Sequence, residues 1–142
     1  MRYLAFDINA AHVESARRVL PEHVTLDVTD FFTTDWRSYL ALLPEPILIV
    51  GNPPWVTNSE LSVLGSANLP KKTNFQNHLG MEAITGKSNF DISEWMLMKL
   101  VDALTGRRGA VAMLCKTVVA RKVLQHAWKH SISIDEIGRA HV

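Results

Sequence analysis

The chain has few of the residues that would place it quickly in a functional class. Only one of its 142 residues is cysteine, Cys115, which excludes an internal disulfide and suits a reducing, cytoplasmic setting. Its six histidines show no spacing typical of metal ligands, so we expect no metal site. Apolar runs are far shorter than the ~20 residues that cross a bilayer, and no signal-peptide pattern is present, so we expect no membrane contact. The net charge is only +1, so any contact with nucleic acid must come from a local patch.

What the chain does have is a regular alternation of strand and helix patterns. Strands are predicted at 3–6, 24–28, 46–50 and 110–115, helices at 10–20, 35–43, 91–104 and 117–129, and the start of a fifth strand at 132–134. The stretch 46–50 is apolar throughout, which is typical of a strand buried on both faces. This alternation indicates an α/β fold of parallel strands, in which ligands bind beyond the carboxyl ends of the strands.

One of these strand ends carries the tetrapeptide Asn52-Pro53-Pro54-Trp55. The prolines fix two φ angles and remove two donors, which leaves the Asn52 side-chain carbonyl and the Pro53 backbone carbonyl as acceptors on a rigid turn. Trp55 adds an aromatic face. Such a turn suits an amino group on a planar ring, because the acceptors can hold both hydrogens and orient the nitrogen lone pair. The structural alternative is a Pro-Pro turn beside a core tryptophan.

The segment 49–55 resembles the catalytic motif of the amino-methyltransferases, especially the DNA adenine-N6 enzymes of restriction-modification systems. The resemblance implies a Rossmann-like class I methyltransferase sheet, S-adenosylmethionine as methyl donor and double-stranded DNA as substrate. It also implies that the target adenine is flipped out and stacks on Trp55. Asn52 and Pro53 would then bind the amino group, with Pro54 completing the catalytic turn.

The resemblance extends to two acidic strand ends upstream. Leu4-Ala5-Phe6-Asp7-Ile8-Asn9 resembles the motif whose acidic residue binds the cofactor ribose hydroxyls, which gives that role to Asp7. Asp30-Phe31-Phe32 resembles the next motif, in which Asp30 accepts a hydrogen of the cofactor adenine and Phe31 packs near the base. The alternative is that both aspartates simply end strands.

Downstream residues admit two interpretations each. Lys71 and Lys72 lie in the segment 56–88 and would contact DNA phosphates if this segment closes over DNA. We expect the segment to be poorly ordered without DNA. The alternative is a solvated loop. Phe90 and Trp95 lie at a helix start that the family places beside its pocket, but core packing explains them better. The family often has proline near Lys116, which leaves the role of that lysine open.

The sequence also leads to expectations about both ends of the chain. The Gly-rich cofactor loop of the family would lie before Leu4, and the first glycine here is Gly51. We therefore expect that the first strand and this loop are missing, and that the chain alone is inactive and binds S-adenosylmethionine weakly or not at all. Residues 137–142 are interpreted as a non-native tail derived from a sequencing adapter, which leaves a partial methyltransferase domain at 1–136. A specificity or nuclease subunit or domain would lie elsewhere.

Three other functions remain open on the same residues. Protein glutamine-N5 methyltransferases share an Asn-Pro-Pro-aromatic loop, although typically with tyrosine in its last position. Ribosomal-RNA base methyltransferases share it as well. The third alternative is an inactive fragment that binds only DNA or a partner subunit.

Overall fold

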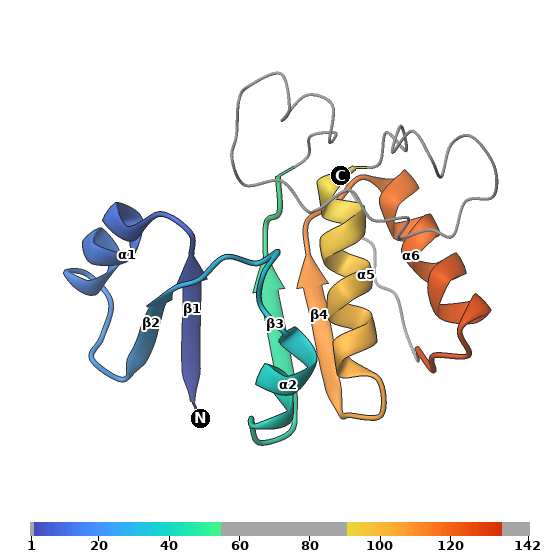
Figure 1. Cartoon of the computed structure of the whole chain (residues 1–142), viewed down its shortest axis with the longest axis horizontal. Helices are drawn as coiled ribbons and strands as arrows, with labels where there is room; N and C mark the ends of the chain where they lie inside the picture. Colours follow the sequence, from blue (N-terminus) through green and yellow to red (C-terminus); the bar gives the residue numbers. More distant parts are fainter. Residues whose placement is uncertain (1, 55–90, 135–142) are drawn as a thin grey trace. The chain divides into compact units, whose positions relative to one another are not determined.

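The computed structural model describes residues 2–54 and 91–134 (Figure 1). The chain folds as two compact units, Met1–Thr34 and Asp35–Val142. Each unit contains one pair of parallel strands with helices packed against it. The architecture is therefore α/β with small parallel sheets.

The first unit consists of strand β1 (Tyr3–Asp7), helix α1 (Ala10–Arg17) and strand β2 (Val24–Val28). The strands pair in register from Tyr3 opposite Val24 to Asp7 opposite Val28. Helix α1 begins as the sequence predicted, because the Asn9 side chain accepts a hydrogen bond from the Ala11 N–H at 2.9 Å.

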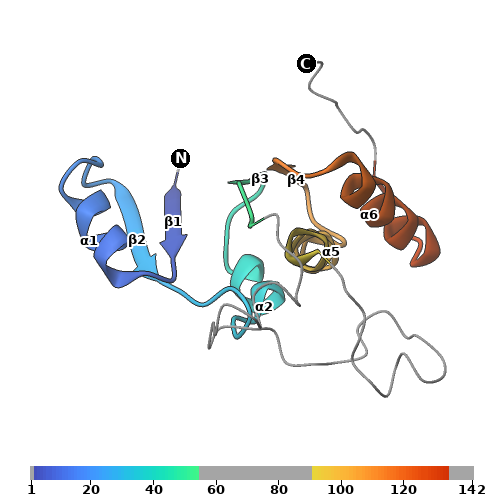
Figure 2. The same cartoon turned by 90° about the horizontal axis from the view of Figure 1, so that it is seen from above.

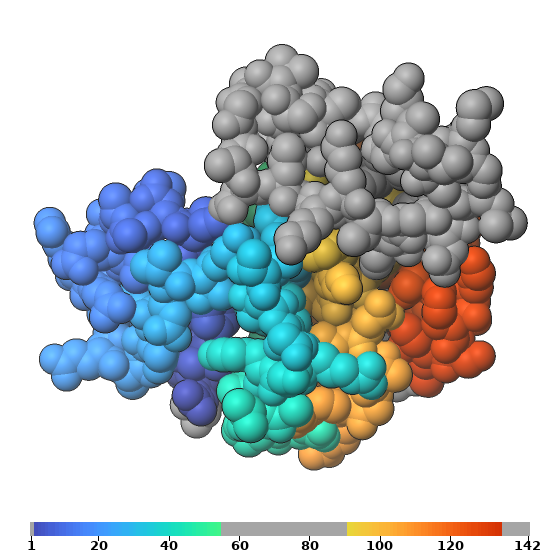
Figure 3. Space-filling view, in the orientation of Figure 1, coloured from blue at the N-terminus to red at the C-terminus, as the bar shows by residue number. Residues whose placement is uncertain are grey.

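The second unit contains helix α2 (Trp36–Ala41), strand β3 (Ile47–Gly51), helix α5 (Ile92–Leu104), strand β4 (Gly109–Met113) and helix α6 (Thr117–Lys129). Strand β3 pairs with β4, with Ile47 opposite Gly109. Seen from above, α2 and α5 lie on the same side of this strand pair (Figure 2). The surfaces of α2 and α5 adjoin on that side (Figure 3).

The core of the second unit lies between these helices and the strand pair. One cluster joins α5 to α6 through Leu97, Met98, Val119 and Val123. The other joins α2, β3 and α5 through Leu40, Ile47 and Ala103. Trp95 is 8% exposed, so its prediction as a core residue is confirmed.

The prediction that strand 46–50 is buried on both faces is wrong. Ile47 is 8% exposed, whereas Leu48 and Val50 are 65% and 72% exposed. Among the described residues, α2 and α5 lie on one side of the strand pair (Figure 2), and only the alternate side chains Ile47 and Ile49 of β3 pack into the cluster with them. The sequence could show that every position is apolar, but not which of these side chains the described helices cover.

Two further predictions need correction. Helix α1 ends at Arg17 instead of residue 20, because the N–H groups of Arg18 and Val19 bond to the carbonyls three residues earlier, those of Ser15 and Ala16, and tighten the last turn. Residues 132–134 form no strand; the Ile132 N–H donates to the Ala127 carbonyl at 2.8 Å and closes the end of α6.

Candidate active site

The Asn-Pro-Pro turn stands directly at the carboxyl end of β3. Pro53 is buried, while Asn52 and Pro54 are exposed, so the turn is anchored and its amide side chain is accessible. The Leu114 N–H donates to the Gly51 carbonyl at 3.2 Å, which extends the strand pairing to the base of the turn. At Gly51 an added Cβ would lie 2.7 Å from the Met113 Cε, so a larger residue there would require Met113 to move.

An ion pair fixes the corner where β4 leads into α6. The Lys116 Nζ lies 2.9 Å from the Asp91 Oδ2. Asp91 is also the N-cap of α5, and its Oδ1 accepts hydrogen bonds from the Ser93 N–H and hydroxyl at 3.0 and 2.5 Å. Burial raises the pKa of the Asp91 carboxyl, but the bonds from Ser93 and Lys116 lower it more, so the net pKa is below its ordinary value. Lys116, whose role the sequence left open, therefore holds the start of α5.

Cys115 is not prepared to act as a nucleophile. Burial is the main cause that raises the pKa of its thiol, so the thiol stays protonated near neutral pH. Its side chain packs against the apolar cluster between α5 and α6. No group of three or more His, Cys, Asp or Glu side chains that could hold a metal ion occurs within residues 2–54 and 91–134.

In the first unit, Asp7 and Asp30 follow the carboxyl ends of paired strands. Asp7 is the last residue of β1, and the Thr29 N–H donates to its carbonyl at 2.9 Å, which places Asp30 one residue beyond that contact. The parallel pairing thus brings both predicted cofactor residues to the same end of the strand pair, as the sequence suggested.

The carboxylate of Asp7 is accessible and charged. Its Oδ1 accepts the Asn9 N–H at 2.7 Å, and its Oδ2 lies 3.4 Å from the His12 Nδ1. The Asn9 hydrogen bond is the main cause that holds the pKa of Asp7 below its ordinary value; burial opposes it, and the contact with His12 lowers the pKa further. The side chain is 45% exposed, so lone pairs remain available to a ligand.

Asp30 and Phe31 form a compact turn after β2. One carboxylate oxygen of Asp30 accepts the Phe32 N–H at 2.9 Å, and its backbone carbonyl accepts the Thr34 hydroxyl at 2.7 Å. Phe31 and Phe32 are half-buried and pack edge to face with centroids 6.2 Å apart. The carboxylates of Asp7 and Asp30 are both acceptors, which matches the two ribose hydroxyls and the amino group of an adenosine as donors. These two carboxylate acceptors therefore fit the hydrogen-bond donors on the adenosine half of S-adenosylmethionine.

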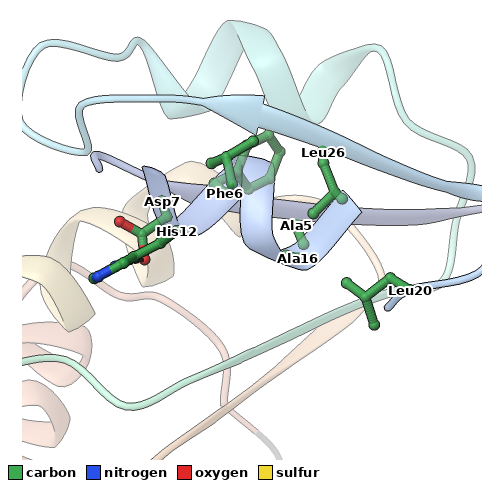
Figure 4. A pocket seen from close by; sticks show the side chains of 8 residues that line it. Ala5, Phe6, Asp7, His12, Ala16, Leu20 and Leu26 are labelled. Carbon is green, nitrogen blue, oxygen red and sulfur yellow. Dashed lines mark hydrogen bonds and ion pairs between the residues drawn. The ribbon is translucent and has the colours of Figure 1, made fainter. Parts of the chain in front are cut away.

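A pocket of about 250 Å³ opens beside Asp7 (Figure 4). Asp7 and His12 lie together at one end of it, and apolar side chains line the rest: Ala5, Phe6, Val13, Ala16, Leu20 and Leu26. The sequence predictions missed His12. The sequence feature that could have identified His12 is the Asn9 cap. This cap fixes where α1 begins, which places His12, the third residue of the helix, beside the end of β1.

Three of the predicted site residues lie outside the part of the chain that the structure describes. They are Trp55, to which the sequence assigned the stacking face, and the two predicted phosphate-binding lysines Lys71 and Lys72. Their roles remain predictions. No helix among the described residues is both long and apolar enough to cross a membrane.

Comparison with known proteins gives one informative relative. Over 105 residues, the chain is 53% identical to the Type II methyltransferase M.NspV of Nostoc sp.. The matched region is 74% of this chain and 22% of M.NspV, so the chain spans about a fifth of the length of that relative. No family model matches the chain. No solved structure matches it either.

Proposed function

We propose that this chain, which is 53% identical to part of a Type II methyltransferase, is part of an enzyme that methylates the N6 amino group of adenine in DNA. S-adenosylmethionine is the proposed methyl donor. When bound, it supplies a sulfonium methyl group that an amino nitrogen can attack. The observation that carries the proposal is an accessible Asn52 on a turn anchored by buried Pro53, in a chain with this degree of identity.

The residues of the turn have a defined task in this proposal. The Asn52 side-chain oxygen and the Pro53 backbone carbonyl accept the two hydrogens of the target amino group. This leaves the nitrogen lone pair free and favours tetrahedral geometry at nitrogen. Because the prolines restrict the backbone, the acceptors need little reorganisation during the reaction. Trp55 would hold the flipped adenine ring by stacking.

Residues of the first unit would hold the adenosine half of the cofactor. Asp7 accepts hydrogen bonds from the ribose hydroxyls, Asp30 accepts one from the base amino group, and Phe31 packs near the base. Both carboxylates already have one oxygen engaged by a backbone N–H, from Asn9 and Phe32, which restricts their orientation before any ligand arrives.

The proposal is tested with a chimera in which this chain replaces the matched segment of M.NspV. The chimera and M.NspV itself are incubated with labelled S-adenosylmethionine and, separately, with unmethylated duplex DNA, ribosomal RNA and a glutamine-containing protein substrate. We expect label in duplex DNA alone, recovered as N6-methyladenine after digestion to nucleosides. Label on another base, in RNA or on a glutamine side chain would contradict the proposed substrate. Absence of any transfer by a chimera that folds, beside an active M.NspV, would contradict the proposed reaction.

A further inference from the structure

The carboxylate of Asp7 is held at both of its oxygens by the first turn of α1. The backbone N–H of Asn9 donates to Oδ1 at 2.7 Å, and the His12 Nδ1 lies 3.4 Å from Oδ2. Asn9 is the cap of the helix and His12 is its third residue, so both contacts follow from the place where α1 begins.

The two contacts differ in what they require of the sequence. A backbone N–H at position 9 is present for almost any residue, whereas the second contact depends on the side chain at position 12. A carboxylate held at one oxygen can still turn about its Cβ–Cγ bond. A donor at the other oxygen fixes the plane of the group, and with it the directions of the remaining lone pairs.

This pair contributes little to the stability of the fold. The His12 and Asp7 side chains are 68% and 45% exposed, and exposed ion pairs have small net effects on folding. The other lining residues named for the pocket are apolar, so none of them can replace the His12 contact (Figure 4). The contact should therefore mainly affect how tightly the Asp7 carboxylate binds a ligand.

We propose that His12 is a positioning residue that fixes the Asp7 carboxylate for the ribose hydroxyls of S-adenosylmethionine. This proposal rests on the proposed function and extends it to a residue that does not itself touch the cofactor. His12 acts by removing one rotational freedom of the Asp7 side chain before the ligand binds, which is a form of preorganisation.

The test measures equilibrium binding, which needs no turnover. The affinity of the M.NspV chimera for S-adenosylhomocysteine is determined by calorimetry, with and without substitutions. We expect His12→Leu to weaken binding about three- to tenfold, the effect of freeing one side-chain torsion. His12→Asn should restore the affinity to within about twofold, because its amide can donate to the same oxygen. Ser15→Leu, at an exposed position of α1, is the matched control and should change nothing.

A second ligand separates a ribose effect from a general one. An analogue that lacks both ribose hydroxyls should bind equally to the unsubstituted and His12→Leu chimeras. The proposal would be overturned if His12→Leu weakened the binding of both ligands equally, or if it left the binding of S-adenosylhomocysteine unchanged. It would also be overturned if the His12→Asn chimera bound S-adenosylhomocysteine as weakly as the His12→Leu chimera. If the unsubstituted chimera binds no S-adenosylhomocysteine while M.NspV does, the proposed function fails, and this proposal with it.

Discussion

Glu94 is buried in the first turn of α5, with a side chain that is 1% exposed. A carboxylate at this position is favoured by the positive end of the helix dipole. Glu94 forms an ion pair with Lys122 of α6, whose Nζ lies 2.7 Å from the Glu94 Oε2. Because one partner is buried and the other is 47% exposed, breaking the pair affects the two groups unequally.

Removal of the cation should therefore destabilise the second unit. We expect Lys122→Met to lower the free energy of unfolding by about 1–3 kcal/mol, because the buried Glu94 carboxylate loses its ion pair with Lys122. Arg121→Met is the matched control: Arg121 is an exposed cation one residue earlier on α6, and its replacement should cost less than about 0.5 kcal/mol. Urea unfolding measures both. Equal losses in the two variants would show that the pair with Glu94 is not the cause.

The Asp91 carboxyl gives the stability of the second unit a dependence on pH. Its folded-state pKa is below the ordinary value, so it stabilises the fold above that ordinary value and the contribution is lost as pH falls through the folded pKa. Asp91→Asn keeps a residue that caps helices well but removes the titration. Between about pH 5 and pH 2, its unfolding free energy should fall less steeply than that of the unsubstituted chain. Identical slopes for the two proteins would contradict this assignment.

At the scale of the element, the pair β3–β4 has two unlike faces. Leu48 and Val50 are exposed on one face of β3, and their pairing partners on β4 are Ala110 and Ala112. Parallel strands are normally covered on both faces, and a contiguous apolar surface of this kind promotes association.

The uncovered face should make the isolated chain self-associate. We expect the double substitution Leu48→Thr and Val50→Thr to reduce concentration-dependent light scattering, with little change in the unfolding free energy, because threonine retains strand propensity. Ile49→Thr, on the covered face of the same strand, should instead destabilise by roughly 1–3 kcal/mol. Scattering that the double substitution leaves unchanged would show that another surface drives association.

The sequence predicted local features of the elements well. The bounds of α6 and β2 agree with the patterns, and α1 and α5 begin after the polar residues Asn9 and Asp91, which cap them. Caps and periodicity act within a few residues, so they can be read from the chain. The end of α1 was missed because Val19 continues the apolar spacing although it is 80% exposed.

What the sequence could not provide depends on contacts between distant residues. The apolar character of β3 did not reveal which of its faces the helices cover. The Asp91–Lys116 pair joins residues 25 positions apart. The positions of Asn52, Asp7 and Asp30 were predictable, because each lies at or within two residues of the end of a strand.

At the scale of the whole molecule, the proposed roles divide between the two units. The proposed acceptors for the cofactor lie in residues 1–34, and the proposed acceptors for the target amino group lie in residues 35–142. The matched region covers 22% of M.NspV, so a chimera supplies the remaining parts of a methyltransferase around both sets of residues.

The most direct test of the central claim is methyl transfer by this chimera with and without Asn52. Labelled S-adenosylmethionine and unmethylated duplex DNA are supplied to the unsubstituted and Asn52→Ala chimeras, and the labelled nucleoside is identified. We expect label at adenine N6 that falls at least about 100-fold with Asn52→Ala, the effect of losing one acceptor for the reacting group. Because Asn52 is exposed, thermal stability and S-adenosylhomocysteine affinity should be retained. Undiminished adenine label in the variant, or label absent from adenine in the unsubstituted chimera, would contradict this claim.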